Sequence, residues 1–119
     1  MEQQYLTRIK ERKQECANLI SNLSKELRQD EANLEKAKLN IYEVFETLYH
    51  ATKKQAKSDE EFLTLYQRRF ETIPESWRTR LRLAREHEDV ATAVIEEIKL
   101  GVVEELQELF LQIFMEGKN

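Results

Sequence analysis

Apolar side chains recur at alternating spacings of three and four residues through the first half of the chain. Twelve of fourteen such positions are apolar, counting cysteine, and the two exceptions are Lys13 and Asp30. The fourteen positions are Leu6, Ile9, Lys13, Cys16, Ile20, Leu23, Leu27, Asp30, Leu34, Ala37, Ile41, Val44, Leu48 and Ala51. No glycine or proline precedes Pro74, so no residue forces a break. A seven-residue repeat predicts a long helix whose seam faces another helix. We therefore expect a helix over residues 3–57, about 80 Å long, that is stable only against a second helix.

Two charged residues interrupt this stripe, and aromatic residues widen its second half. Lys13 and Asp30 either fix the register of the seam or mark places where it opens to water. Tyr42, Phe45 and Tyr49 extend the apolar surface. The second half of this helix is therefore expected to contact more than one neighbour.

Two helix starts follow. Ser58 with Glu61 three residues later is typical of a capping box, and predicts a helix over 59–72. Pro74 suits the first turn of a third helix, over 75–116. Gly101 lies inside that helix and permits either a close helix contact or a bend.

The expected fold class is all-α: an elongated antiparallel helical hairpin or coiled coil with a short extra helix near the turn. Two arrangements fit. If the chain reverses near Ser58, residues 59–116 form a return arm kinked at Pro74. If it reverses near Pro74, the first two helices form one arm. The stronger cap and the matched arm lengths favour reversal near Ser58.

Length and composition agree with a single helical domain over residues 1–119. Charged residues make up 35% of the chain, with only two glycines and one proline, which is typical of long helices. Charge is uneven: residues 1–57 carry 11 basic and 9 acidic side chains, 58–85 carry 6 and 5, and 86–119 carry 2 and 9. The acidic last third is either a solvated helix face or a surface that meets basic side chains.

The sequence offers no site for catalysis, so we expect a protein that is not an enzyme and needs no cofactor. His50 and His87 have no second histidine or cysteine at a helical metal-ligand spacing. No glycine-rich phosphate loop occurs. No apolar run approaches the ~20 residues of a membrane span, and the N-terminus lacks the apolar core of a signal peptide. We expect a cytoplasmic protein, or one exported by a route without a cleaved signal peptide.

Two segments are candidate partner surfaces. Residues 77–85 are rich in arginine, which suggests nucleic acid, but interleaved glutamates and the acidic total make an ion-paired face the simpler interpretation. The C-terminal apolar stretch spreads round more than one helix face. We expect it to contact another chain or the Tyr42–Tyr49 region. The candidate partner-binding residues are Leu106, Leu109, Phe110, Ile113, Phe114, Trp77 and Phe70.

One segment resembles a known family. Phe62, Tyr66, Arg69 and Phe70, leading into Glu75-Ser76-Trp77, resemble the small helical-hairpin proteins that accompany LXG-type toxins in bacterial type VII secretion. The resemblance covers residues 60–90, and the family's Trp-x-Gly turn is absent. It implies an adaptor or chaperone that folds together with a long helical partner.

Three functions follow as hypotheses. The leading one is a helical adaptor or targeting partner that packs along another helical protein. The second is a self-assembling structural coiled coil, similar in architecture to the stalk proteins of export ATPases. The third is a nucleic-acid-binding regulator.

Overall fold

The computed structural model describes residues 1–115, and all regular structure in that part of the chain is helical. In chain order the elements are α1 (Glu2–Lys25), α2 (Gln29–Gln55), α3 (Asp59–Thr72), α4 (Glu75–Glu86), α5 (Val90–Phe110) and a π-helical turn, η1 (Leu111–Met115). The all-α fold class is therefore confirmed for the described residues.

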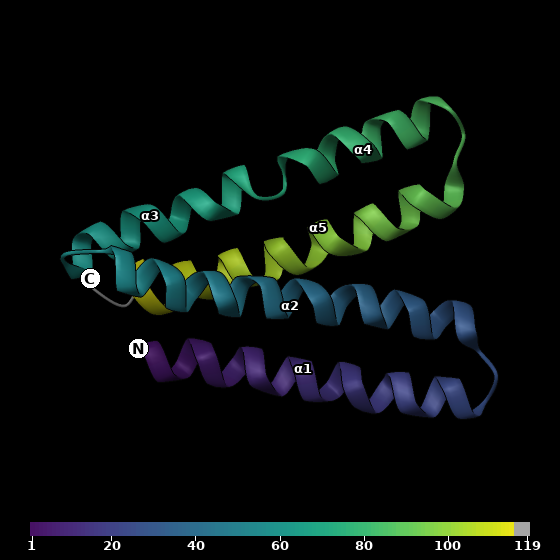
Figure 1. Cartoon of the computed structure of the whole chain (residues 1–119), viewed down its shortest axis with the longest axis horizontal. Coiled ribbons are helices and arrows are strands. Elements are labelled where there is room, and N and C mark those ends of the chain that lie inside the picture. Colours follow the sequence, from purple (N-terminus) through teal and green to yellow (C-terminus); the bar gives the residue numbers. More distant parts are fainter. Residues whose placement is uncertain (116–119) are drawn as a thin grey trace.

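The chain runs back and forth along the molecule in four arms (Figure 1). α1 and α2 are antiparallel, α3 and α4 form one kinked arm, and α5 returns between α4 and α2. Connections at residues 26–28, 56–58 and 87–89 are short, which makes consecutive helices antiparallel neighbours. The result is two helical hairpins, α1/α2 and α4/α5, in place of one long hairpin.

The helix expected over 3–57 is divided at residues 26–28. Leu27 takes a left-handed backbone conformation, with φ 61°. Its N–H bonds to the Ser24 carbonyl at 3.2 Å, and the Arg28 N–H bonds to the Leu23 carbonyl at 2.8 Å. This pair of bonds is the Schellman arrangement, which normally ends a helix at glycine. The expectation of an unbroken helix was wrong, because leucine occupies the left-handed position where glycine would have signalled a helix end.

The helix expected over 75–116 is divided in the same way at residues 87–89. Glu88 has φ 56°. Its N–H bonds to Arg85 at 3.2 Å, and the Asp89 N–H bonds to Ala84 at 2.7 Å. Asp89 then caps α5, since its carboxylate accepts the Thr92 N–H at 3.2 Å.

The other two boundaries agree with the sequence. Ser58 Oγ accepts the Glu61 N–H at 3.1 Å and caps α3. Pro74 immediately precedes α4 and bends the third arm without reversing it (Figure 1). Among the two expected turn positions, the chain reverses near Ser58 and continues forward at Pro74.

Folding α2 back onto α1 turns the two halves of the heptad stripe towards each other. Ile9, Cys16 and Ile41 are buried in the resulting core. Lys13 pairs with Glu46 across the hairpin at 2.9 Å, so its charge is compensated. Asp30 lies exposed in the first turn of α2, just past the break.

Leu27, which the heptad pattern placed in the seam, is 90% exposed at the turn. Its expected burial against another helix is therefore wrong.

The largest part of the core is aromatic and lies where α1 begins and α5 ends. It joins residues from five elements: Tyr5, Phe45, Tyr49, Phe62, Tyr66, Phe70, Phe110 and Phe114. Tyr66 is central to it. Its hydroxyl donates to the Phe45 carbonyl at 3.0 Å and lies 2.8 Å from the Tyr5 hydroxyl, which can therefore donate to it. Burial raises the pKa of both phenols above the ordinary range, so both stay neutral.

Away from this aromatic core the two hairpins diverge. Their tips, at residues 26–28 and 87–89, lie apart on the same side of the molecule (Figure 1). The described part measures 46 × 34 × 26 Å, much shorter than the expected rod of about 80 Å. One face of α5 consequently has no helix of its own chain over it along much of its length.

Candidate functional site

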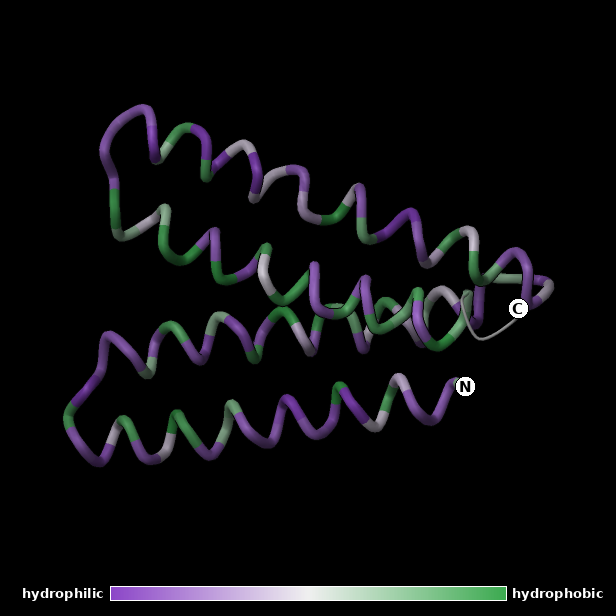
Figure 2. Tube along the Cα trace, turned by 180° about the vertical axis from the view of Figure 1, so that it is seen from behind, coloured by the Kyte–Doolittle hydropathy of each residue, from purple (hydrophilic) through white to green (hydrophobic). Residues whose placement is uncertain are grey.

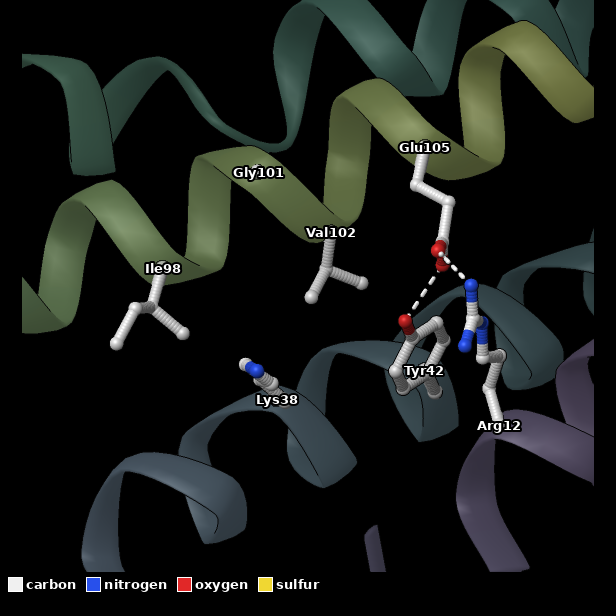
Figure 3. A pocket seen from close by; sticks show the side chains of 7 residues that line it. All are labelled: Arg12, Lys38, Tyr42, Ile98, Gly101, Val102 and Glu105. Carbon is white, nitrogen blue, oxygen red and sulfur yellow. Dashed lines mark hydrogen bonds and ion pairs between the residues drawn. The ribbon is translucent and has the colours of Figure 1, made fainter. Parts of the chain in front are cut away.

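A cavity of about 380 Å³ lies where the hairpins separate (Figure 3). Its lining comes from α1, α2 and α5: Arg12, Lys38, Tyr42, Ile98, Gly101, Val102 and Glu105. α5 forms one wall with Ile98, Val102 and Glu105, and charged or phenolic side chains of the other hairpin form the opposite wall (Figure 3).

The polar groups of this cavity bind one another. Glu105 accepts the Tyr42 hydroxyl at 2.5 Å and pairs with Arg12 at 2.8 Å. Burial and the Glu105 carboxylate raise the pKa of Tyr42 above its ordinary value. Lys38 pairs with Glu35 at 3.1 Å. Because each charge has a partner, this cluster anchors α5 to the α1/α2 hairpin and leaves no unmatched charge for a small ligand.

Gly101 stands out among the cavity residues. Glycine in a helix interior costs about 1 kcal/mol relative to alanine. A Cβ added at Gly101 would meet nothing within 4 Å, so packing inside the chain does not require a glycine. The missing side chain instead exposes the α5 backbone to close approach from outside.

Apolar side chains extend this open face towards the tip of α5. Val90 is 71% exposed and Val94 37%. Val90, Val94 and Gly101 are spaced by four and seven residues, which places them on one side of the helix. Figure 2 shows α5 as richer in hydrophobic residues than α4, which lies beside it.

A second cavity, of about 540 Å³, borders the same face on its α4 side. It is lined by Ala84, Arg85, Glu88, Asp89, Val90, Ala93, Val94 and Glu97. The open face of α5 is thus bordered by one cavity near the tip, on the α4 side, and by another at Gly101, on the side of the α1/α2 hairpin. We call this surface, formed by Val90, Val94, Glu97, Ile98, Gly101, Glu104 and Glu108, the α5 outer face.

Carboxylates surround Gly101 on this face. Glu97, Glu104 and Glu108 are all exposed and lie within two turns of the glycine. Glu97 pairs with Arg85 at 2.8 Å. Glu104 and Glu108 have no ion-pair partner within residues 1–115. The α5 outer face is therefore apolar near the tip and acidic beyond Gly101.

The structure places most of the sequence-predicted partner surface inside the protein. Phe70, Leu106, Phe110 and Phe114 are 1%, 0%, 0% and 7% exposed. Phe110 lies 5.1 Å from Tyr66, measured between ring centroids. These four side chains belong to the chain's own core and are not available to a partner in this fold, which corrects the expectation for them.

The other three predicted residues are half-buried. Leu109 and Ile113 pack against the edge of the same core. Trp77 lies on α4 with the Lys99 ammonium 5.3 Å from its ring centroid. The sequence missed the exposed valines of α5, although Gly101 and the high apolar content of residues 90–103 were a usable signal.

Two of the four arginines in residues 77–85 hold α4 on α5. Arg80 pairs with Glu96 and Arg85 with Glu97, at 3.1 and 2.8 Å. Glu96 is only 2% exposed and also contacts Lys99 at 3.3 Å. A buried carboxylate needs such partners, so these cations are largely committed within the hairpin.

Residues 1–115 contain no group of three or more histidine, cysteine or acidic side chains placed to hold a metal ion. Over the same residues, no helix combines the length and the apolar character that a membrane crossing requires.

Comparison with protein-family models, with curated proteins and with solved structures found no match to this chain.

Proposed function

We propose that this chain is a non-enzymatic helical adaptor, a targeting or chaperone partner that packs along another helical protein through the α5 outer face. The observation that carries the proposal is the combination of exposed Val90 and Val94 with an unexplained interior glycine, Gly101, on one side of a single helix. Exposed apolar side chains gathered on one face are typical of binding surfaces.

The shape of this face favours a helix as the bound element. An apolar ridge with residues four and seven apart matches the spacing by which helices pack. A glycine at the centre lets two backbones approach closely, because no side chain separates them. A helix is also the element that could lie against both cavities, since each runs beside α5.

The resemblance of residues 60–90 to the partners of LXG-type toxins suggests which helical protein to test first. Such toxins carry a long helical N-terminal domain, and an adaptor of this kind would fold together with it. Under this proposal the aromatic core, to which α3 contributes Phe62, Tyr66 and Phe70, holds the scaffold, while α5 makes the contact.

The test is co-purification from cells that make both this protein and the helical domain of a toxin encoded beside its gene. We expect the wild-type chain to retain the toxin domain and Val94→Lys to lose it. Leu19→Lys, on α1, is the matched control because Leu19 is also exposed, at 46%. Circular dichroism would verify that both variants keep their helices.

Retention of the toxin domain by Val94→Lys, or equal loss in both variants, would contradict the assignment of the contact to α5. Absence of binding by the wild-type chain would contradict the adaptor function with this class of partner.

A further inference from the structure

We infer that the helix bound by the α5 outer face is basic and amphipathic, with a small residue where it crosses Gly101. The inference rests on the proposed function and adds the chemistry of the partner. It commits to a segment of another protein and not to a second copy of this chain.

The first step is electrostatic. Beyond Gly101 the α5 outer face presents Glu104 and Glu108, which have no cationic partner within residues 1–115. The cations that line the two adjoining cavities are already paired within the chain: Arg12 with Glu105, Lys38 with Glu35 and Arg85 with Glu97. A partner with lysine or arginine beside its apolar stripe would match these carboxylates, whereas an acidic partner would be repelled.

The second step argues against the pairing of two α5 outer faces. In an antiparallel pair of α5 helices crossing at Gly101, Glu104 of one copy would face Glu97 of the other, since these residues lie three after and four before the glycine. Arg85 is already paired with Glu97, so the second copy offers Glu104 a carboxylate and no free cation. In a parallel pair, Glu104 and Glu108 of one copy would face the same two residues of the other copy. Both arrangements juxtapose like charges, which destabilises helix pairs.

The third step concerns the contact at Gly101. Open space surrounds the position of its absent Cβ, and the cavity that Gly101 lines with Ile98 and Val102 leaves room for flanking side chains. A partner helix gains closest approach here only if its own residue is alanine, glycine or serine. A bulky residue would hold the two helices apart and leave Val94 uncovered.

The test uses the full chain and designed peptides measured by fluorescence anisotropy. Each peptide has 21 residues, the length of α5, and an apolar stripe with alanine at its centre. One carries lysine beside the stripe and the other glutamate. We expect the lysine peptide to bind about tenfold or more tightly than the glutamate peptide, with the difference shrinking as salt is raised.

Three variants locate the contact. Glu104→Lys with Glu108→Lys should reverse the preference between the two peptides. Gly101→Leu should strongly weaken binding of the lysine peptide. Leucine in place of the peptide's central alanine should weaken binding in the same way. Glu43→Lys, an exposed charge on α2, is the matched control and should leave the preference unchanged.

Equal affinity for both peptides, or a preference that survives reversal of Glu104 and Glu108, would overturn the inference while leaving the adaptor function intact. If neither peptide binds while the toxin domain is still retained through Val94, the inference is also overturned and the adaptor function still stands. A dimer seen by light scattering that Gly101→Leu abolishes would overturn it in favour of a second copy of this chain.

Discussion

Leu27 and Glu88 hold a backbone conformation that costs an ordinary residue roughly 1–2 kcal/mol. Each ends a helix through two backbone hydrogen bonds, and each lies at a hairpin tip. Their side chains are exposed and contribute little packing to offset that cost. Both tips therefore carry a backbone cost that their own side chains do little to offset.

Leu27→Gly should raise the free energy of unfolding, by up to about 1 kcal/mol, because glycine adopts the left-handed conformation without strain. Urea denaturation would measure the change. Ala17→Gly, at an exposed position within α1, is the control and should cost about 1 kcal/mol. A loss of stability at both positions would contradict the assigned turn.

Asp89 gives the fold a pH dependence at the other tip. Its pKa is lowered because its carboxylate accepts hydrogen bonds from the hydroxyl and the backbone N–H of Thr92. Folding thus favours the deprotonated form. The stabilisation is fully present above the unfolded pKa, ordinarily 3.8, and disappears as the pH falls through the lower folded value.

Asp89→Asn isolates this effect, since asparagine caps a helix without titrating. As the pH falls from neutral to below the ordinary Asp pKa, wild type should lose stability relative to Asp89→Asn. Denaturation of both proteins across a pH series would show it. A difference that stays constant with pH would rule out the capping role.

At the scale of elements, the end of α5 decides whether the aromatic core closes. Phe110 contacts rings from α1, α3 and η1, including Tyr5, Tyr66 and Phe114. From the sequence we expected this place to contact either another chain or the Tyr42–Tyr49 region. The structure instead makes it the point where α5 is fixed to α1 and α3.

Phe110→Ala should lower the free energy of unfolding by about 3–5 kcal/mol, because it leaves a cavity at a fully buried site. Thermal or urea denaturation followed by circular dichroism would measure this. Met115→Ala, 37% exposed, should change stability by less than about 0.5 kcal/mol. A stable, fully helical Phe110→Ala protein would restore the surface interpretation.

At the scale of the whole molecule, two hairpins joined at one end replace a single long rod. The radius of gyration of the described Cα atoms is 15.9 Å. A rod about 80 Å long would have a radius of gyration of roughly 23 Å. The two arrangements are therefore readily separated in solution.

Small-angle scattering of the monomer should give a radius close to 15.9 Å plus a small contribution from hydration. Leu19→Lys can be measured beside it, since a change at an exposed side chain should not alter the shape. A radius above 20 Å in a monomeric sample would favour the rod and exclude the folded α1/α2 hairpin.

The sequence by itself determined the helical class, the cap at Ser58, the helix start at Pro74 and the interior position of Gly101. These features are local: they depend on the spacing of apolar residues, on one hydroxyl group and on the special backbones of proline and glycine. The all-helical class is confirmed for the described residues, and the Ser58 cap is present in the structure.

Only the tertiary structure decided where the long arms fold back and which apolar face is covered. The same heptad pattern fits one continuous helix and a helical hairpin, because in both cases the apolar residues of each half face the seam. The turns use Leu27 and Glu88 in place of glycine, so composition does not reveal them. Burial of Phe110 depends on Tyr5 and Tyr66, far away in sequence. The apolar content of residues 90–103 was visible in the sequence, but for the same reason only the placement of the two hairpins showed that Val90 and Val94 stay exposed.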